Sequence, residues 1–126
     1  MTNRNLIILS VICLISFLTS CNSGYQKEDN KWSWVSYDEA VWKRQLIIEE
    51  ADLETFSVLE LEKFSVLENN KYAKDKKNVY LNGRIIKFAD PNSFKVIDNG
   101  YSKDNNSIYL DWDKVIFADT KTFEQL

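Results

Sequence analysis

Histidine is absent from this 126-residue chain, and cysteine, glycine and proline are scarce, with two, three and one copies. Without histidine, the chain lacks the commonest general base and metal ligand of proteins. Both cysteines, Cys13 and Cys21, lie among the first 21 residues, so the remainder has no thiol nucleophile and no disulfide. Zinc, haem and iron–sulfur sites lack ligands, and no glycine-rich phosphate loop occurs. We therefore expect no cofactor.

The N-terminal segment has the three parts of a secretory signal: one positive charge at Arg4, an apolar run over residues 6–18, and small residues after it. The run is shorter than the roughly 20 apolar residues that span a membrane. Leu18-Thr19-Ser20-Cys21 resembles the lipobox of bacterial lipoproteins. This resemblance implies a signal peptide over residues 1–20 and a diacylated Cys21 that binds the mature chain to a membrane. The alternative is a plain cysteine beside a conventional cleavage site.

Removal of residues 1–20 would leave 106 residues with 15 basic and 19 acidic side chains, a formal charge of −4. One small domain is expected at this length. This balance argues against nucleic acid as a partner, because its binding needs a basic patch. Aromatic and β-branched residues are plentiful, which favours strands.

Residues 21–31 are polar and are predicted to form a tether between lipid and domain. Within them, Lys27-Glu28-Asp29 resembles the lysine-plus-acidic signal that sends lipoproteins of the Bacteroidetes group to the cell surface. The alternative is a solvated linker. The expected location is the bacterial cell envelope, in the outer membrane, with surface exposure as an open question.

An internal repeat is the most informative feature of the sequence. Blocks recur 29 positions apart without a gap, and they are Tyr72-Ala73-Lys74-Asp75 with Tyr101-Ser102-Lys103-Asp104, Val79-Tyr80-Leu81 with Ile108-Tyr109-Leu110, and Phe88-Ala89-Asp90 with Phe117-Ala118-Asp119. An upstream copy at an offset of 38 places Trp34 opposite Tyr72 and Trp42 opposite Tyr80. The extra length contains a tandem duplication, residues 56–63 followed by 64–71. The repeat domain is predicted over residues 32–126, with units at about 34–71, 72–100 and 101–126.

The recurring Lys-Asp turn, the Val/Ile-Tyr pair and the Ala-Asp-x-x-Ser/Thr-Phe element resemble the DKNYY family over about residues 34–126. The first unit departs from the family pattern because it lacks the Lys-Asp turn. The resemblance implies a repeat protein of a kind often found among bacterial lipoproteins. It implies no established activity and no catalytic residue.

Each unit is predicted to contain a β-hairpin and a further strand. Asn82-Gly83 is the strongest short hairpin signal, since both central residues of a type I′ turn need positive φ. The next unit has Asp111-Trp112-Asp113 in this region, which predicts a wider or different turn. Asp90-Pro91 predicts a short helical or 3₁₀ turn, and residues 94–97 alternate as a strand. The expected fold is mainly β, a small repeat protein of about three hairpin-plus-strand units, stacked or paired edge to edge, with short 3₁₀ or helical turns between them.

Aromatic residues at equivalent positions are expected to pack in rows. One predicted row holds Phe56, Phe94 and Phe123, and another holds Trp42, Tyr80 and Tyr109. The alternative is a carbohydrate-stacking platform. Trp32 and Trp112 do not recur, so they are the candidates for exposed contact.

Carboxylates are the remaining candidates for acid–base chemistry. The repeat relates four of them in pairs, Asp75 with Asp104 and Asp90 with Asp119. Each stands where a turn or an N-cap would use it, which favours a structural role. The oxygen-rich Asp98–Gly100 and Asp104–Asn106 do not continue into a calcium-binding loop. We expect a non-enzymatic envelope module that binds a protein or a glycan; the alternatives are a carboxylate-dependent hydrolase of envelope polysaccharide and a structural spacer.

Overall fold

A computed structural model describes residues 23–40, 42–59, 71–98 and 100–123. They form three small antiparallel sheets with no helix among them, so the predicted β-class is confirmed. The first sheet contains β1 (Gly24–Glu28), β2 (Lys31–Ser36) and β3 (Arg44–Ile47). The second contains β4 (Ser57–Val58), β5 (Tyr72–Lys74), β6 (Val79–Leu81) and β7 (Arg84–Ile85). The third contains β8 (Lys95–Asp98), β9 (Tyr101–Lys103), β10 (Ile108–Leu110) and β11 (Asp113–Lys114).

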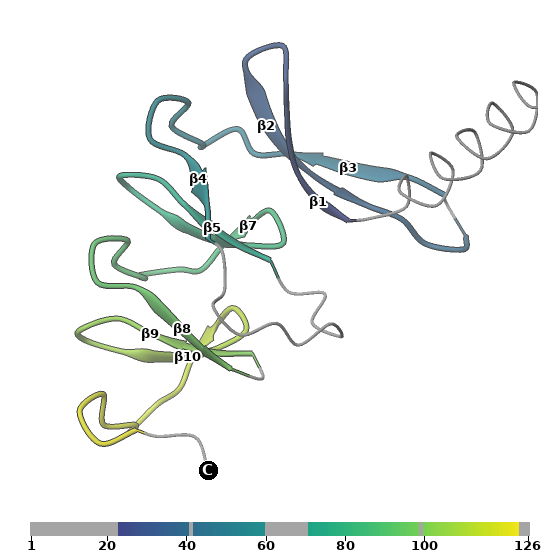
Figure 1. The fold of residues 1–126 in the computed structure, drawn as a ribbon. Coiled ribbons are helices and arrows are strands. Elements are labelled where there is room, and N and C mark those ends of the chain that lie inside the picture. Colours follow the sequence, from purple (N-terminus) through teal and green to yellow (C-terminus); the bar gives the residue numbers. More distant parts are fainter. Residues whose placement is uncertain (1–22, 41, 60–70, 99, 124–126) are drawn as a thin grey trace, which may run out of the picture.

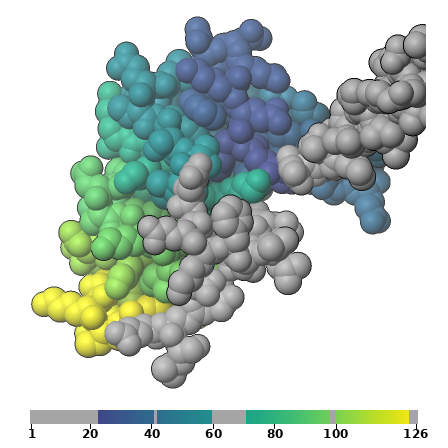
Figure 2. All heavy atoms as spheres, viewed as in Figure 1, coloured from purple at the N-terminus to yellow at the C-terminus, as the bar shows by residue number. Residues whose placement is uncertain are grey.

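The sheets follow one another as a stack in chain order (Figure 1). Each sheet has its own hydrogen-bonded ladder, so the units are stacked and not paired edge to edge. On the face seen in Figure 2, the described units lie against one another from the purple end to the yellow end. Neighbouring units are therefore held together through side chains and turns.

The boundary between structural units falls one strand earlier in the chain than the boundary predicted from the sequence repeat. Residues 94–97 were predicted as the last strand of the unit at 72–100, yet β8 pairs with β9 and so belongs to the third sheet. In the same way β4 pairs with β5. The second copy of the eight-residue duplication lies almost wholly outside the described residues.

The hairpin turns β6–β7 and β10–β11 behave differently although each has two central residues. Asn82 and Gly83 have φ of 49° and 81°, which is the predicted type I′ combination. In the third sheet Leu110 pairs with Asp113, and of the two residues between them only Asp111 has positive φ, at 53°. The turn is therefore different, as expected, but not wider. The segment after Asp90 is a turn and contains no helix.

Strand β6 of the second sheet is buried on both faces, because this sheet lies between the other two (Figure 1). Val79, Tyr80 and Leu81 are all fully buried. Tyr80 joins Ala73 in the cluster that includes Phe56 and Ile48, whereas the flanking residues of β6 belong to the cluster around Phe94. Alternate side chains of one strand thus serve two cores, which explains the unbroken apolar run.

The predicted tether is wrong where the structure describes it. Residues 24–28 form β1, which pairs along its whole length with β2, and Asp29 and Asn30 close the hairpin with φ of 47° and 57°. Tyr25 holds this strand to the domain. Its ring lies edge-on to Trp34 and Phe56, with centroids 5.1 and 5.6 Å away, and its hydroxyl donates to the Lys71 carbonyl at 3.0 Å.

The start of the first structural unit has a different register from the one inferred at an offset of 38, whereas Asp52 and Phe56 keep that offset from Asp90 and Phe94. Tyr25, Tyr72 and Tyr101 each contact the phenylalanine that follows a capping turn, Phe56, Phe94 and Phe123, at centroid distances of 5.6, 5.9 and 5.4 Å. Tyr25-Gln26-Lys27-Glu28 is therefore the first copy of the Tyr-x-Lys-acid motif. Trp34 does not take the place of Tyr72.

The predicted phenylalanine row is confirmed, and the other row is corrected. Phe56 and Phe94 are buried, and Phe123 packs on Tyr101. Tyr80 and Tyr109 are fully buried, but Trp42 is 76% exposed. Trp42 fails to join them because β3 pairs directly with β2, which leaves Trp42 outside the strands, in the connection between Ser36 and Arg44.

Tyr25→Ala tests whether β1 belongs to the folded domain. We expect the free energy of unfolding to fall by roughly 2–4 kcal/mol, because the ring fills the space between Trp34 and Phe56. Urea unfolding of the purified full-length protein, followed by tryptophan fluorescence, measures this change. Lys27→Ala on the same strand removes an exposed side chain and should change stability by less than about 0.5 kcal/mol. Equal stability of Tyr25→Ala and the unsubstituted protein would contradict the assignment.

Candidate functional site

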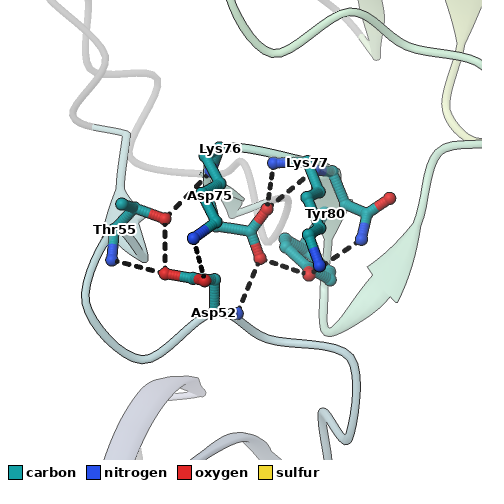
Figure 3. Close-up of polar contacts among 7 residues, drawn as sticks. Asp52, Thr55, Asp75, Lys76, Lys77 and Tyr80 are labelled. Atoms are coloured by element: carbon teal, nitrogen blue, oxygen red, sulfur yellow. Dashed lines mark hydrogen bonds and ion pairs between the residues drawn. The ribbon is translucent and has the colours of Figure 1, made fainter.

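The two aspartates of the Lys-Asp turns are the most deeply buried carboxylates among the described residues, each 4% exposed. Asp75 follows β5, and its Oδ1 accepts hydrogen bonds from the amides of Lys77 and Asn78 at 2.8 and 2.7 Å. Its Oδ2 accepts from the Tyr80 hydroxyl at 2.7 Å and from the Asp52 amide at 2.9 Å (Figure 3). Four donors thus surround one carboxylate.

Asp104 repeats this arrangement in the third unit. Its Oδ1 accepts from the amides of Asn106 and Ser107, both at 2.8 Å. Its Oδ2 accepts from the Tyr109 hydroxyl and the Asp90 amide, both at 2.9 Å. The turn aspartate of each of these units therefore binds its own turn, its own tyrosine and the end of the preceding unit.

The amide that comes from the preceding unit belongs to a capping turn. Asp52 accepts from the amide and the hydroxyl of Thr55 at 3.0 and 2.8 Å, and Thr55 Oγ1 in turn accepts from the Lys76 amide at 3.0 Å (Figure 3). Asp90 and Asp119 likewise accept from the hydroxyl three residues on, that of Ser93 at 2.7 Å and that of Thr122 at 2.8 Å, and they also accept from the amides of Asn92 and Lys121 at 3.0 and 3.1 Å. The three capping turns lie along one side of the stack, at the left in Figure 1.

The hydrogen bonds determine the charge of these aspartates. Burial alone would raise the pKa of Asp75, but the bonds from the Asp52 amide, the Tyr80 hydroxyl and its own turn outweigh burial and lower it. The same balance lowers the pKa of Asp104. Burial and the hydrogen bond to Asp104 raise the pKa of Tyr109 to about 12. Both carboxylates are therefore ionised acceptors in the folded chain.

All four aspartates that the sequence singled out are thus hydrogen-bonded to amides of their own turns. The structural reading of these residues is confirmed. No group of three or more acidic or thiol side chains that could hold a metal ion occurs in the described part of the chain. Asn99, which belongs to one of the oxygen-rich segments, lies outside that part.

The other predicted site residues have different surroundings. Cys21 lies outside the described residues. Lys27 and Glu28 are exposed at the end of β1, and Asp29 is exposed in the hairpin turn. These three residues are therefore part of a folded hairpin and not of a linker.

The prediction of an exposed contact at Trp32 is not supported. Its ring stacks on Phe56 at a centroid distance of 4.5 Å, and its indole nitrogen is buried. Trp112 is 38% exposed, and its indole N–H donates to the Leu81 carbonyl at 3.0 Å. Trp112 thus remains a candidate for contact, with its ring held in a fixed position.

Trp112 lines an open groove of about 660 Å³, and residues of all three sheets contribute to it. The lining residues are Trp34 and Ser36 of β2, Arg44, Gln45 and Leu46 of β3, Asn82 and Arg84 of the β6–β7 hairpin, and Trp112. The groove exists because the hairpin tip lies on β2: a Cβ atom added to Gly83 would be 2.4 Å from the Trp34 Cβ. This volume is in the range of pockets that hold small ligands.

Sequence reasoning missed the groove because its residues come from separate units. One signal was available. The chain has three arginines, Arg4, Arg44 and Arg84, and both that follow residue 20 line this groove. The other basic residues are thirteen lysines, none of which belongs to the described lining, so arginine is the basic residue that marks the groove.

Comparison with known proteins bears on the repeats. Residues 34–94 match the DKNYY family. The chain carries a DKNYY-family segment. The resemblance inferred from the repeated motifs is thereby confirmed over residues 34–94. The DKNYY segment starts in β2 and ends at Phe94, so the Tyr25 copy of the motif lies outside the match. No curated protein and no solved structure matches the chain. Among the described residues, no helix is long and apolar enough to cross a membrane.

Asp75→Asn tests the turn carboxylate. We expect the free energy of unfolding at pH 7 to fall by about 2–3 kcal/mol, because an amide can accept at one oxygen only and leaves buried donors unpaired. Since the pKa of Asp75 is lower in the folded chain than its ordinary 3.8, the charge stabilises the fold above that pH and ceases to do so as the pH falls through the folded-state pKa.

Urea unfolding at pH 7 and at pH 3 measures both effects. The unsubstituted protein should lose more stability than Asp75→Asn between these two values. Asp113→Asn, an exposed aspartate of β11, is the matched control and should behave as the unsubstituted protein does. If Asp75→Asn is as stable as the control at pH 7, the carboxylate does not hold the units together.

Proposed function

We propose that this chain is a lipid-anchored module of the bacterial cell envelope that binds an envelope component without transforming it. Anchoring rests on the lipobox-like Leu18-Thr19-Ser20-Cys21. Binding rests on the groove, which combines two arginines, a tryptophan fixed by a hydrogen bond, and polar side chains in one opening. The groove is the observation that carries the proposal.

The carboxylates that are fully engaged in hydrogen bonds favour a binding function over hydrolysis. A glycosidase needs one carboxylic acid and one free carboxylate on either side of the bond it cleaves. Asp75 and Asp104 each accept four hydrogen bonds, and a lowered pKa does not suit a general acid. No carboxylate belongs to the described lining of the groove. These observations support a module that holds its ligand.

The groove also favours a binding module over a plain spacer. A spacer needs stacking contacts between its units and nothing further. Here an exposed tryptophan and an arginine, Trp112 and Arg84, face one opening without contributing to the buried clusters. Side chains that do not serve the core are the ones available for a ligand.

Cys21→Ser tests the anchor. We expect cells that express the full-length gene and receive an alkyne-tagged palmitate to label the unsubstituted protein, and the Cys21→Ser variant to remain unlabelled, because the thiol is the attachment point. Cys13→Ser, in the apolar run, is the matched control and should be labelled fully. Labelling of Cys21→Ser would exclude Cys21 as the lipid site.

Trp112→Ala tests the binding role. Purified full-length protein in mild detergent should sediment with detergent-washed envelopes, and Trp112→Ala should lower the retained fraction at least fivefold. Trp42→Ala removes a tryptophan that is more exposed and lies outside the groove, so retention should not change. Urea midpoints establish that both variants are folded.

Two results would contradict the proposal. One is retention that is absent, or that falls equally with Trp42→Ala and Trp112→Ala. The other is a continuing release of soluble sugar from the envelopes, with new reducing ends, that stops in Asp104→Asn; it would favour the hydrolase.

A further inference from the structure

The described lining of the groove is basic in a chain whose net charge is negative. Arg44 and Arg84 line it, and no aspartate, glutamate or lysine does. The chain as a whole has 19 acidic and 16 basic residues. A basic groove on an acidic protein attracts anions locally and does not bind polyanions over the whole surface.

Arg84 is the more available of the two cations. It forms no salt bridge and no side-chain hydrogen bond with any residue that the structure describes. Arg44 is joined to Asp38, with 2.8 Å between Nε and Oδ2, and this contact orients the Arg44 side chain. A guanidinium group presents paired donors that match the two oxygens of a carboxylate.

Trp112 adds a rigid apolar surface beside these cations. Its indole N–H is already bonded to the Leu81 carbonyl at 3.0 Å, so the exposed part of the side chain offers ring carbons and no free donor. Gln45 and Ser36 add an amide and a hydroxyl to the same lining. An aromatic face suits the C–H surface of a sugar ring, and amide and hydroxyl groups suit its hydroxyls.

We propose that the groove binds a carboxylate-bearing sugar, a hexuronic acid unit of an acidic polysaccharide, with Arg84 and Arg44 on the carboxylate and Trp112 against the ring. The ligand class rests on the proposed binding function and makes it specific. A free phosphate would use the arginines and leave the tryptophan unexplained. An acidic peptide would supply carboxylates without a ring to stack. The open groove of about 660 Å³ has room for one or two sugar units and lets a chain continue beyond them.

Isothermal titration of the full-length protein in detergent tests this ligand class with four probes: an oligogalacturonide, a neutral oligogalactoside, inorganic phosphate and oligoglutamate. The oligogalacturonide should bind at least tenfold more tightly than each of the others. Arg84→Gln should weaken its binding roughly tenfold, as expected for a charge-assisted hydrogen bond. Arg84→Lys should restore only part of the affinity, because lysine lacks the paired donors.

Lys87→Gln is the matched control, since it removes one positive charge from an exposed residue outside the groove. Its affinity should stay within twofold of the unsubstituted protein. Equal binding of oligoglutamate or phosphate would overturn the sugar assignment, and equal losses with Lys87→Gln and Arg84→Gln would show attraction by overall charge.

The sedimentation experiment with envelopes distinguishes a failure of the ligand class from a failure of the binding function. If Trp112→Ala lowers envelope retention but the titration shows no preference for the oligogalacturonide, the ligand class is wrong and the binding function stands. If retention does not depend on the groove and no probe binds, both are wrong.

Discussion

The hydrogen bond from the end of one unit to the turn aspartate of the next is the interaction on which this structure depends. At Asp75 it comes from the Asp52 amide and at Asp104 from the Asp90 amide, both at 2.9 Å. A buried carboxylate is costly unless every lone pair is used, and here four donors use them. The cost of burial is thus offset only when the preceding unit is in place, which makes the stacking specific.

The tyrosine and lysine of the Tyr-x-Lys-acid motif contact the capping turn that ends their own unit and the phenylalanine that follows this turn. The rings of Tyr72 and Tyr101 contact Phe94 and Phe123, and Lys74 and Lys103 donate to the carbonyls of Pro91 and Thr120 at 3.0 and 3.5 Å. One short motif therefore contacts both the end of the preceding unit and the end of its own unit. Sheets of three or four short strands would expose most of their apolar surface alone, and these contacts let each sheet cover the next.

Sequence reasoning succeeded where the determinants are local. The turn at Asn82-Gly83 and the turn aspartates depend on residues two or three positions apart. The first unit was misplaced because Trp34 resembles an aromatic position of the repeat, whereas Tyr25, the true equivalent, stands in a polar stretch that resembles a linker. Pairing with β2 outweighs that polar composition. The groove could not be inferred from spacing, because its walls are 28 or more residues apart, as Trp34, Arg84 and Trp112 illustrate.

Because the groove is built from three sheets, binding of a ligand there is linked to the stacking of those sheets. β2, the β6–β7 hairpin and Trp112 come from three sheets, and they form one opening only in the stacked arrangement. A ligand that contacts all three binds the stacked chain and not the unstacked one, so by mass action it must favour stacking to the same degree that stacking favours the ligand. Under the proposed function, the ligand would therefore join the three sheets along the repeat axis and raise the resistance of the stack to mechanical load.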